Sequence, residues 1–283
     1  MVVSLLGSML LTSCGSGTPL EQTPGPATSL TDGNQLDATP SVTSADPNLT
    51  PHQRLMALAQ SISATPADGT ADLPYTYLHT QTWTRATNMI VRTDVRRWRR
   101  DADGSGQEVT RRLPDLPGVD HQPERDERKL FAKAPETLTR HRVNTLHPHL
   151  PGPLPADAET LTGALAPREL AAEPAYPRML TGGVVGLATS QYLNREQRAA
   201  SLRVLATVPQ IKYLGKTTDL AGRPGLGFSV TADGSTSQLV IDPNSGEILA
   251  AQERVTGRRP GLFSYVLILE RGHTASTRPA AYP

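Results

Sequence analysis

The sequence contains a single cysteine, so no disulfide can form within the chain. It holds no run of about 18–20 apolar residues, the length that a membrane-spanning helix needs. Aromatic residues make up only 4% of its 283 residues, whereas 25 are proline, which favours long loop or linker segments. A net charge of +1 provides no global field for nucleic acid or a strongly acidic partner, so we expect neither.

Motifs of common catalytic chemistry are missing too. The sequence contains no Gly-x-Ser-x-Gly, no His-Glu-x-x-His, no Walker loop and no dinucleotide fingerprint. Gly104-Ser105-Gly106 lies between two expected strands with no histidine nearby in the sequence. We therefore expect no enzyme and no cofactor, while a triad assembled from distant residues stays open.

In exported proteins generally, an unpaired cysteine indicates either an intermolecular bridge or a modification. Residues 1–12 are apolar, have the length of a signal peptide and are too short to span a bilayer. Leu11-Thr12-Ser13-Cys14 then resembles the bacterial lipobox. That resemblance implies removal of residues 1–13 and lipidation of Cys14 with chains such as palmitate. Two or three acyl chains would hold the protein on the extracytoplasmic face of the cell membrane.

The start of the chain departs from this pattern, because no lysine or arginine precedes Arg54. Signal peptides usually begin with a positively charged segment, so we expect the true start to lie upstream of Met1. The alternative is a buried apolar helix with an ordinary core cysteine. Residues 14–49 favour export, since they are mostly threonine, serine, proline and glycine without an aromatic residue, and read as a disordered tether. We also expect disorder in residues 274–283.

Residues 50–273 carry the patterns of one α+β domain. Thr50-Pro51 and Asn194-Arg195 begin helices, each with glutamine three residues after the cap. Residues 114–155 contain many prolines and predict irregular structure, with a helical turn near 126–133. The other expected helices are 157–165 and 179–192. The expected strands are 74–85, 90–100, 107–113, 211–220, 226–231, 238–242, 247–255 and 262–271.

Short turns between successive strands require antiparallel pairing. The order of elements along the chain, first strands, then helices and then strands again, favours helices on one face of the sheet. In the strand at 74–85 neither face is plainly apolar, which suits a curved sheet.

Several motifs together resemble an actinobacterial family of exported proteins of unknown function. They span residues 70–271 and are Tyr75-x-Tyr77 with Trp83, Trp98, Leu154-Pro155-Ala156-Asp157, the helix at 198–209, Asp219-x-Ala221-Gly222-Arg223-x-Gly225 and Ile241-Asp242-Pro243-x-x-Gly246. The resemblance implies membrane anchoring and a link to extracytoplasmic sigma factors. The layout is also distantly similar to the half-barrel sheets of periplasmic lipoprotein carriers and sigma-regulatory lipid sensors.

Such a half-barrel would hold an amphipathic or lipid ligand between its sheet and its helices. We name Tyr75, Tyr77 and Trp83 as lining residues, with Leu202 and Leu205 as cover. A closed, dry core built from the same residues is the alternative. The competing function is an extracytoplasmic interaction module that binds an envelope protein and no small molecule.

Other polar clusters have simpler interpretations. Asp219 and Arg223 bracket a glycine turn, and the Asp242–Gly246 segment has too few oxygen ligands for calcium. His121, His141, His147 and His149 lie in or near a proline-rich stretch, so we expect loop histidines and no metal. Arg96-Arg97-Trp98-Arg99-Arg100 sends arginines to both faces of a strand. We expect them to pair with Asp94, Asp101 and Glu108, although anionic headgroups or wall polymers are an alternative.

Overall fold

The computed structural model describes residues 48–69 and 73–277. The predicted signal peptide, Cys14, most of the tether and residues 278–283 of the predicted tail lie outside the described residues. Within the described ranges, no helix is long and apolar enough to cross a membrane.

Helices and strands in these ranges form an α+β arrangement, as predicted. The helices are α1 (Pro51–Ser63), α2 (Arg125–Leu130), α3 (Ala158–Leu165), α4 (Tyr176–Ser190) and α5 (Arg195–Thr207), with 3-10 turns η1 (Phe131–Lys133) and η2 (Arg168–Leu170). The strands are β1 (Tyr75–Ala86), β2 (Met89–Arg100), β3 (Gly106–Pro117), β4 (Glu136–His141), β5 (Lys212–Thr218), β6 (Pro224–Ala232), β7 (Ser235–Ile241), β8 (Ile248–Val255) and β9 (Gly261–Thr274).

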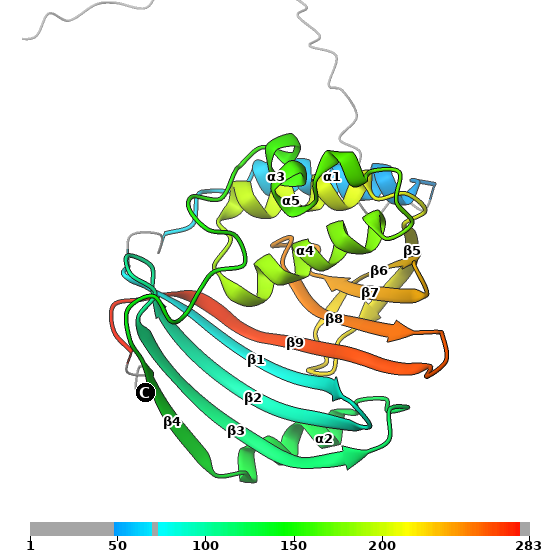
Figure 1. Cartoon of the computed structure of the whole chain (residues 1–283). Coiled ribbons are helices and arrows are strands. Elements are labelled where there is room, and N and C mark those ends of the chain that lie inside the picture. Colours follow the sequence, from blue (N-terminus) through cyan, green and yellow to red (C-terminus); the bar gives the residue numbers. More distant parts are fainter. Residues whose placement is uncertain (1–47, 70–72, 278–283) are drawn as a thin grey trace, which may run out of the picture. The chain divides into compact units, whose positions relative to one another are not determined.

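All nine of these strands join one antiparallel sheet in the order β4-β3-β2-β1-β9-β8-β7-β6-β5 (Figure 1). Short turns join β1 to β2 to β3 and each successive pair from β5 to β9, whereas α2 and η1 lie between β3 and β4. β1 also pairs with β9, so strands distant in sequence lie side by side at the centre. The sheet is not closed, and β4 and β5 form its edges.

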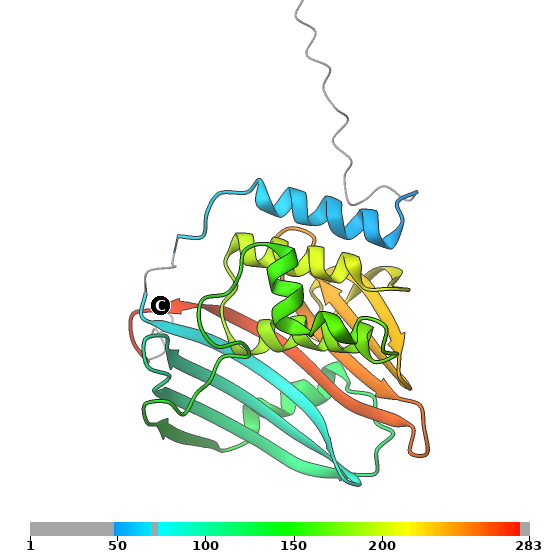
Figure 2. The same cartoon turned by 45° about the horizontal axis from the view of Figure 1, so that its top comes forward.

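The helix layer begins with α1, whose capping box is the one predicted. The Thr50 hydroxyl accepts a hydrogen bond from the Gln53 amide at 3.2 Å, and the Gln53 side chain accepts one from the Thr50 amide at 3.0 Å. This exchange satisfies two helix-end donors. α1 packs on α5, and α4 lies against β6, β7 and β8 (Figure 2).

Two hydrophobic clusters occupy opposite faces of the sheet. The larger one joins α1, α3, α4 and α5 to one face and contains Ile268. The smaller one contains Trp83, Phe131 and Leu267 on the other face. Successive strand residues point to opposite faces, so Leu267 and Ile268 belong to different clusters.

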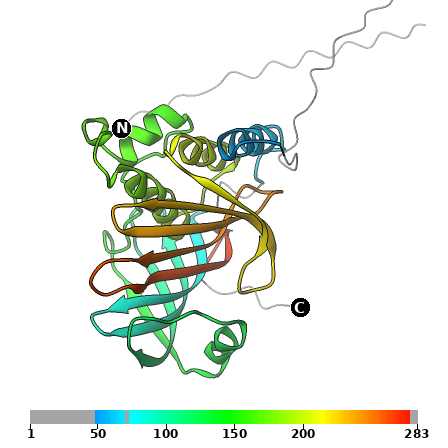
Figure 3. The same cartoon turned by 90° about the vertical axis from the view of Figure 1, so that its right-hand side faces the viewer.

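The prediction that helices pack on one face is therefore not confirmed. Phe131 lies in η1, directly after α2, and is 1% exposed within the smaller cluster. Figures 1 and 3 show α2 on the side of the sheet opposite α4. β4 was not predicted, because its six residues are almost all exposed and lack the alternation that reveals a strand.

Candidate functional site

The five residues predicted to line a ligand site do not come together. Trp83 is fully buried, with its ring edge-on to Phe131 and Tyr265 at centroid distances of 5.6 Å. Leu202 and Leu205 lie in the other cluster, between α1 and α4. The sheet separates the two groups, because the odd-numbered residues of β1 face away from the helix layer.

The two tyrosines of β1 are also accounted for by other contacts. The Tyr77 ring lies 4.9 Å from that of Trp98, and its hydroxyl donates to Glu270 at 2.9 Å. Tyr75 is half-buried at the start of the strand. The interpretation of these residues as a closed core fits the geometry better than a shared ligand chamber.

Both predicted turns are present. The Asp219 carboxylate accepts from the Arg223 amide at 2.9 Å and from Arg223 Nε at 2.7 Å. The remaining Arg223 nitrogens donate to main-chain carbonyls of β8 and β9. The Asp242 carboxylate accepts from the Asn244 amide at 2.9 Å, which closes the second turn. The side chains of Asp219 and Asp242 hold their own turns, and that of Arg223 also ties its turn to β8 and β9.

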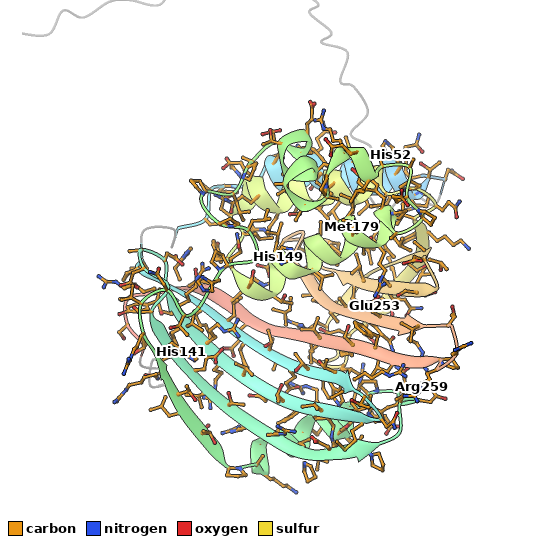
Figure 4. The ribbon with its side chains drawn as sticks, in the orientation of Figure 1. His52, His141, His149, Met179, Glu253 and Arg259 are labelled. Atoms are coloured by element: carbon orange, nitrogen blue, oxygen red, sulfur yellow. The ribbon has the colours of Figure 1, made fainter. Side chains whose placement is uncertain are left out.

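The histidines fall into separate surroundings (Figure 4). His121 bonds Glu127 and His141 bonds Glu108, both at 2.9 Å. The His149 ring rests on α4 where Gly186 leaves room, since a Cβ there would meet the ring at 2.4 Å. Among the described residues, no cluster of three or more histidine, cysteine or carboxylate side chains could hold a metal ion.

Acidic neighbours pair with the arginines of β2. Arg96 bonds Glu136, Arg97 bonds Glu108 and Arg99 bonds Asp101. Arg100 lies 3.4 Å from Asp103. The predicted pairing with Asp101 and Glu108 is confirmed, whereas Asp94 pairs with His79.

A hollow of about 510 Å³ lies where the β2–β3 turn meets the helix layer, and we call it the hairpin hollow. Its volume is within the range of small-molecule sites. It is lined by Thr76, residues 99–104, Asn144, residues 146–148 and 151–154, Gln191, Tyr192, Gln197 and His273.

The loop at 144–154 forms one wall and is held at three points. The Asn144 amide donates to the Asp103 carbonyl at 2.8 Å, and the Leu146 amide donates to the Gly104 carbonyl at 2.9 Å. The His149 amide donates to Ser190 Oγ at 3.0 Å. These bonds anchor the loop to the hairpin and to α4, so the wall has a defined position without regular structure.

Three residues that line the hollow each have one buried polar atom without a hydrogen-bond partner among the described residues. They are Arg99 Nε, Gln191 Oε1 and His273 Nδ1. Arg99 is 8% exposed and Gln191 is 6% exposed, so solvent reaches them poorly. Three other hollows in the described part, of about 710, 520 and 240 Å³, contain no such atom in their lining. Other described residues away from these hollows, such as Gln81 and Arg111, also hold such an atom. We take the hairpin hollow as the candidate site because its lining combines charged, polar and apolar side chains from several elements.

Burial and hydrogen bonds set the protonation states of Asp101 and Tyr192 at the hairpin hollow. Burial raises the pKa of Asp101, but hydrogen bonds from His273 and Thr76 and the charge of Arg99 outweigh it. The pKa of Asp101 therefore lies below its ordinary value, and the group is a carboxylate at neutral pH. Burial and the hydrogen bond to Asp68 raise the pKa of Tyr192, which keeps its hydroxyl protonated.

The sequence patterns did not reveal this site, because its parts lie far apart along the chain. Arg99 was assigned to an arginine-rich strand, and Gln191 and His273 belong to no motif. Only the proline-rich loop gave a signal, since a long irregular segment in a folded domain is often functional.

No protein-family model matches this chain, and comparison with curated proteins finds no significant match.

Proposed function

We propose that the chain is an exported bacterial lipoprotein that binds an amphipathic or lipid ligand and catalyses no reaction. Lipid on Cys14 would hold it on the extracytoplasmic face of the cell membrane, as the lipobox and the tether composition indicate. Its ligand would occupy the hairpin hollow. The observation that carries this proposal is a hollow of about 510 Å³ whose lining combines the paired charges of the β2–β3 turn with apolar side chains of the loop at 144–154.

Buried polar groups without hydrogen-bond partners destabilise a folded protein. A buried polar group without a partner costs about 1–3 kcal/mol, so folded proteins rarely keep several together. Arg99, Gln191 and His273 lie on β2, at the end of α4 and on β9. The unpartnered atoms of these three residues are themselves closed to solvent, so a ligand in the hollow would bond them only after a neighbouring side chain moves.

Irregularities in the strand pairing also support the proposal. Register shifts occur in five strand pairs, and such irregularities bend and twist a sheet. We propose that this bending forms the half-barrel that the sequence resemblance implies, with α1, α3, α4 and α5 as the main helix layer. The ligand would sit at the rim, because large buried side chains fill both faces of the central sheet.

The anchor is tested by growing cells with alkyne-tagged palmitate and measuring label on the full chain. Cys14→Ser should abolish labelling, because the thiol is the acceptor, whereas the neighbouring Ser16→Ala should retain it. Label that persists in Cys14→Ser would overturn the lipoprotein assignment.

The ligand site is tested by native mass spectrometry with extraction of bound small molecules, on the full chain purified from membranes in detergent. We expect a co-purifying amphipathic molecule in the wild type, and its loss in Gln191→Leu. Gln238→Leu, on the exposed part of β7, is the matched control and should keep the ligand. Thermal unfolding of both variants checks that they remain folded.

An interaction module is the second candidate, and β4 favours it. This edge strand exposes nearly all of its side chains, with Leu138 at 52% exposure, and an open edge can pair with a strand of another protein. A ligand-free wild type that instead retains an envelope protein through cross-linking at β4 would move the assignment to this function. We propose no nucleic-acid partner, because acidic neighbours already pair with the arginines of β2.

A further inference from the structure

The two edges of the sheet differ in how they protect their unpaired backbone groups. An edge strand can pair with another chain unless a bulge, a lysine or a covering segment prevents it. β5 has two of these features, because its pairing with β6 shifts between Tyr213 and Gly215 and because Lys212 and Lys216 are exposed on it. β4 contains no lysine and pairs with β3 in one unbroken register over residues 136–141. β4 is therefore the less protected edge.

Among the described residues, the segment that follows β4 turns away from this edge. The Asn144 and Leu146 amides donate to the carbonyls of Asp103 and Gly104 at 2.8 and 2.9 Å, so the chain returns to the β2–β3 turn. Figure 1 shows β4 as the outermost strand on its side of the sheet. Leu138, at the centre of the strand, is 52% exposed. A second strand beside β4 would remove part of this apolar surface from water.

The residues of β4 form a self-complementary sequence. Glu136–Arg140 reads Glu-Thr-Leu-Thr-Arg. An antiparallel second copy centred on Leu138 would place glutamate opposite arginine, threonine opposite threonine and leucine opposite leucine. Each of these cross-strand pairs stabilises an antiparallel ladder. β5 also has a leucine near its centre, but the same arrangement about Leu214 would place Lys212 opposite Lys216, and these like charges would repel.

The charged groups at the two ends of this sequence are available to a second copy. The Glu136 side chain is 46% exposed, and Arg96 and Arg111 both bond its Oε1, so its Oε2 has no partner among the described residues. Arg140 is exposed and has no carboxylate partner in the described part of the chain. A symmetric interface repeats each contact, so two Glu136–Arg140 pairs would form, one on each side of Leu138.

We infer that two copies of this chain form a symmetric dimer through β4, with their sheets joined edge to edge. This inference goes beyond the proposed function and does not involve the hairpin hollow. A strand of six residues gives a small contact, and anchoring on a membrane would supply the high local concentration that a small contact needs. A strand of a different protein is the alternative occupant, and the experiment separates the two.

Pairing at β4 is measured by thiol cross-linking in membranes of cells that produce the full chain. Leu138→Cys places a thiol at the centre of the proposed pairing, where a short bis-maleimide should join two copies into a band of twice the mass. Leu214→Cys, at a side chain that is 51% exposed on β5, is the matched control and should give no such band. The wild type, whose single cysteine is Cys14, reveals any cross-link that does not come from an introduced thiol.

The register is tested by charge exchange, with sedimentation equilibrium of the purified full chain in density-matched detergent. Arg140→Glu would place carboxylates opposite each other and should raise the Kd of the dimer about tenfold or more. Glu136→Arg would oppose two cations and should do the same. An equal mixture of these variants should restore the dimer, because opposite charges then meet at both ends. Arg142→Glu makes the same charge change beyond the end of β4 and should leave the Kd unchanged. Circular dichroism checks that each variant is folded.

A chain that stays monomeric in detergent and gives no Leu138→Cys cross-link in membranes would overturn the inference. So would a dimer whose Kd does not respond to Arg140→Glu, because another surface would then hold it. A Leu138→Cys cross-link to a different protein would also overturn the inference and would favour the interaction module. The palmitate and ligand measurements do not depend on β4, so failure of the dimer and failure of the proposed function are distinguishable.

Discussion

Asp94 is a carboxylate buried inside the sheet, at 4% exposure. Its oxygens lie 3.1 Å from His79 Nε2, and one accepts from Gln81 Nε2 at 2.7 Å. Burial raises the pKa of Asp94, but these hydrogen bonds and the charges of His79 and Arg111 outweigh it, so the pKa is lowered. A carboxylate whose pKa is lower in the folded state stabilises the fold at pH values above its pKa in the unfolded chain. This contribution is lost as the pH falls through the folded-state pKa.

We therefore expect Asp94→Asn to lower the free energy of unfolding by about 1–3 kcal/mol near neutral pH. The variant should also lose less stability than the wild type as the pH falls below 3.8, the ordinary pKa of aspartate. Denaturant unfolding at a series of pH values measures both effects. Asp126→Asn, at an exposed carboxylate in a surface ion pair with Lys129, is the control and should change the stability and its pH dependence little. Equal pH dependence in wild type and Asp94→Asn would contradict the assignment.

Trp83 distinguishes a closed core from a ligand chamber. Its ring is fully buried against Phe131 and Tyr265, so Trp83→Ala should cost about 3–5 kcal/mol of unfolding free energy. Urea unfolding followed by circular dichroism measures this loss. Leu214→Ala, at a side chain that is 51% exposed, should change little. A small loss in Trp83→Ala would mean that the surroundings are not closely packed.

At the scale of elements, α4 contains three glycines, and two of them, Gly182 and Gly186, have different surroundings. A Cβ at Gly182 would meet nothing within 4 Å, so Gly182→Ala should stabilise the protein by up to about 1 kcal/mol. A Cβ at Gly186 would meet the His149 ring at 2.4 Å. Gly186→Ala should gain less, because the ring must move and the loop at 144–154 loosens.

Thermal unfolding ranks the two variants, and the NMR signals of His149 report the displacement. A larger stabilisation from Gly186→Ala than from Gly182→Ala would show that the loop does not depend on this contact.

Elements whose own residues determine them could be predicted from the sequence. Two capping boxes marked α1 and α5, and alternating residues with glycine turns marked eight of the nine strands described here. β4 was not predicted because its residues show no strand pattern of their own. It is a strand because it pairs with β3. The candidate site escaped for a similar reason. Arg99, Gln191 and His273 meet only because β9 returns beside β1, and no local pattern encodes that pairing.

At the scale of the folded unit, Arg198 connects segments that are distant in sequence. This side chain is 7% exposed, and its guanidinium donates to both oxygens of Asp68 at 3.0 and 3.1 Å. It also donates to the carbonyls of Leu193 and Ser245 at 2.8 Å. One residue of α5 thereby holds the segment before β1, the α4–α5 loop and the β7–β8 turn.

Removing the Arg198 side chain should destabilise both the helix layer and the sheet. Arg198→Met removes the charge that compensates the Asp68 carboxylate and four hydrogen bonds of the guanidinium, so we expect a loss of about 3–5 kcal/mol of unfolding free energy. Arg198→Lys should restore little, because an ammonium cannot reach two carboxylate oxygens and two carbonyls at once. Arg168→Met removes an exposed arginine that bonds Glu159 and serves as the control. Denaturant unfolding gives the energies, and hydrogen exchange should rise in α1 and in β8 alike. Faster exchange confined to α5, or full rescue by lysine, would show that Arg198 contributes only local charge and does not join the helix layer to the sheet.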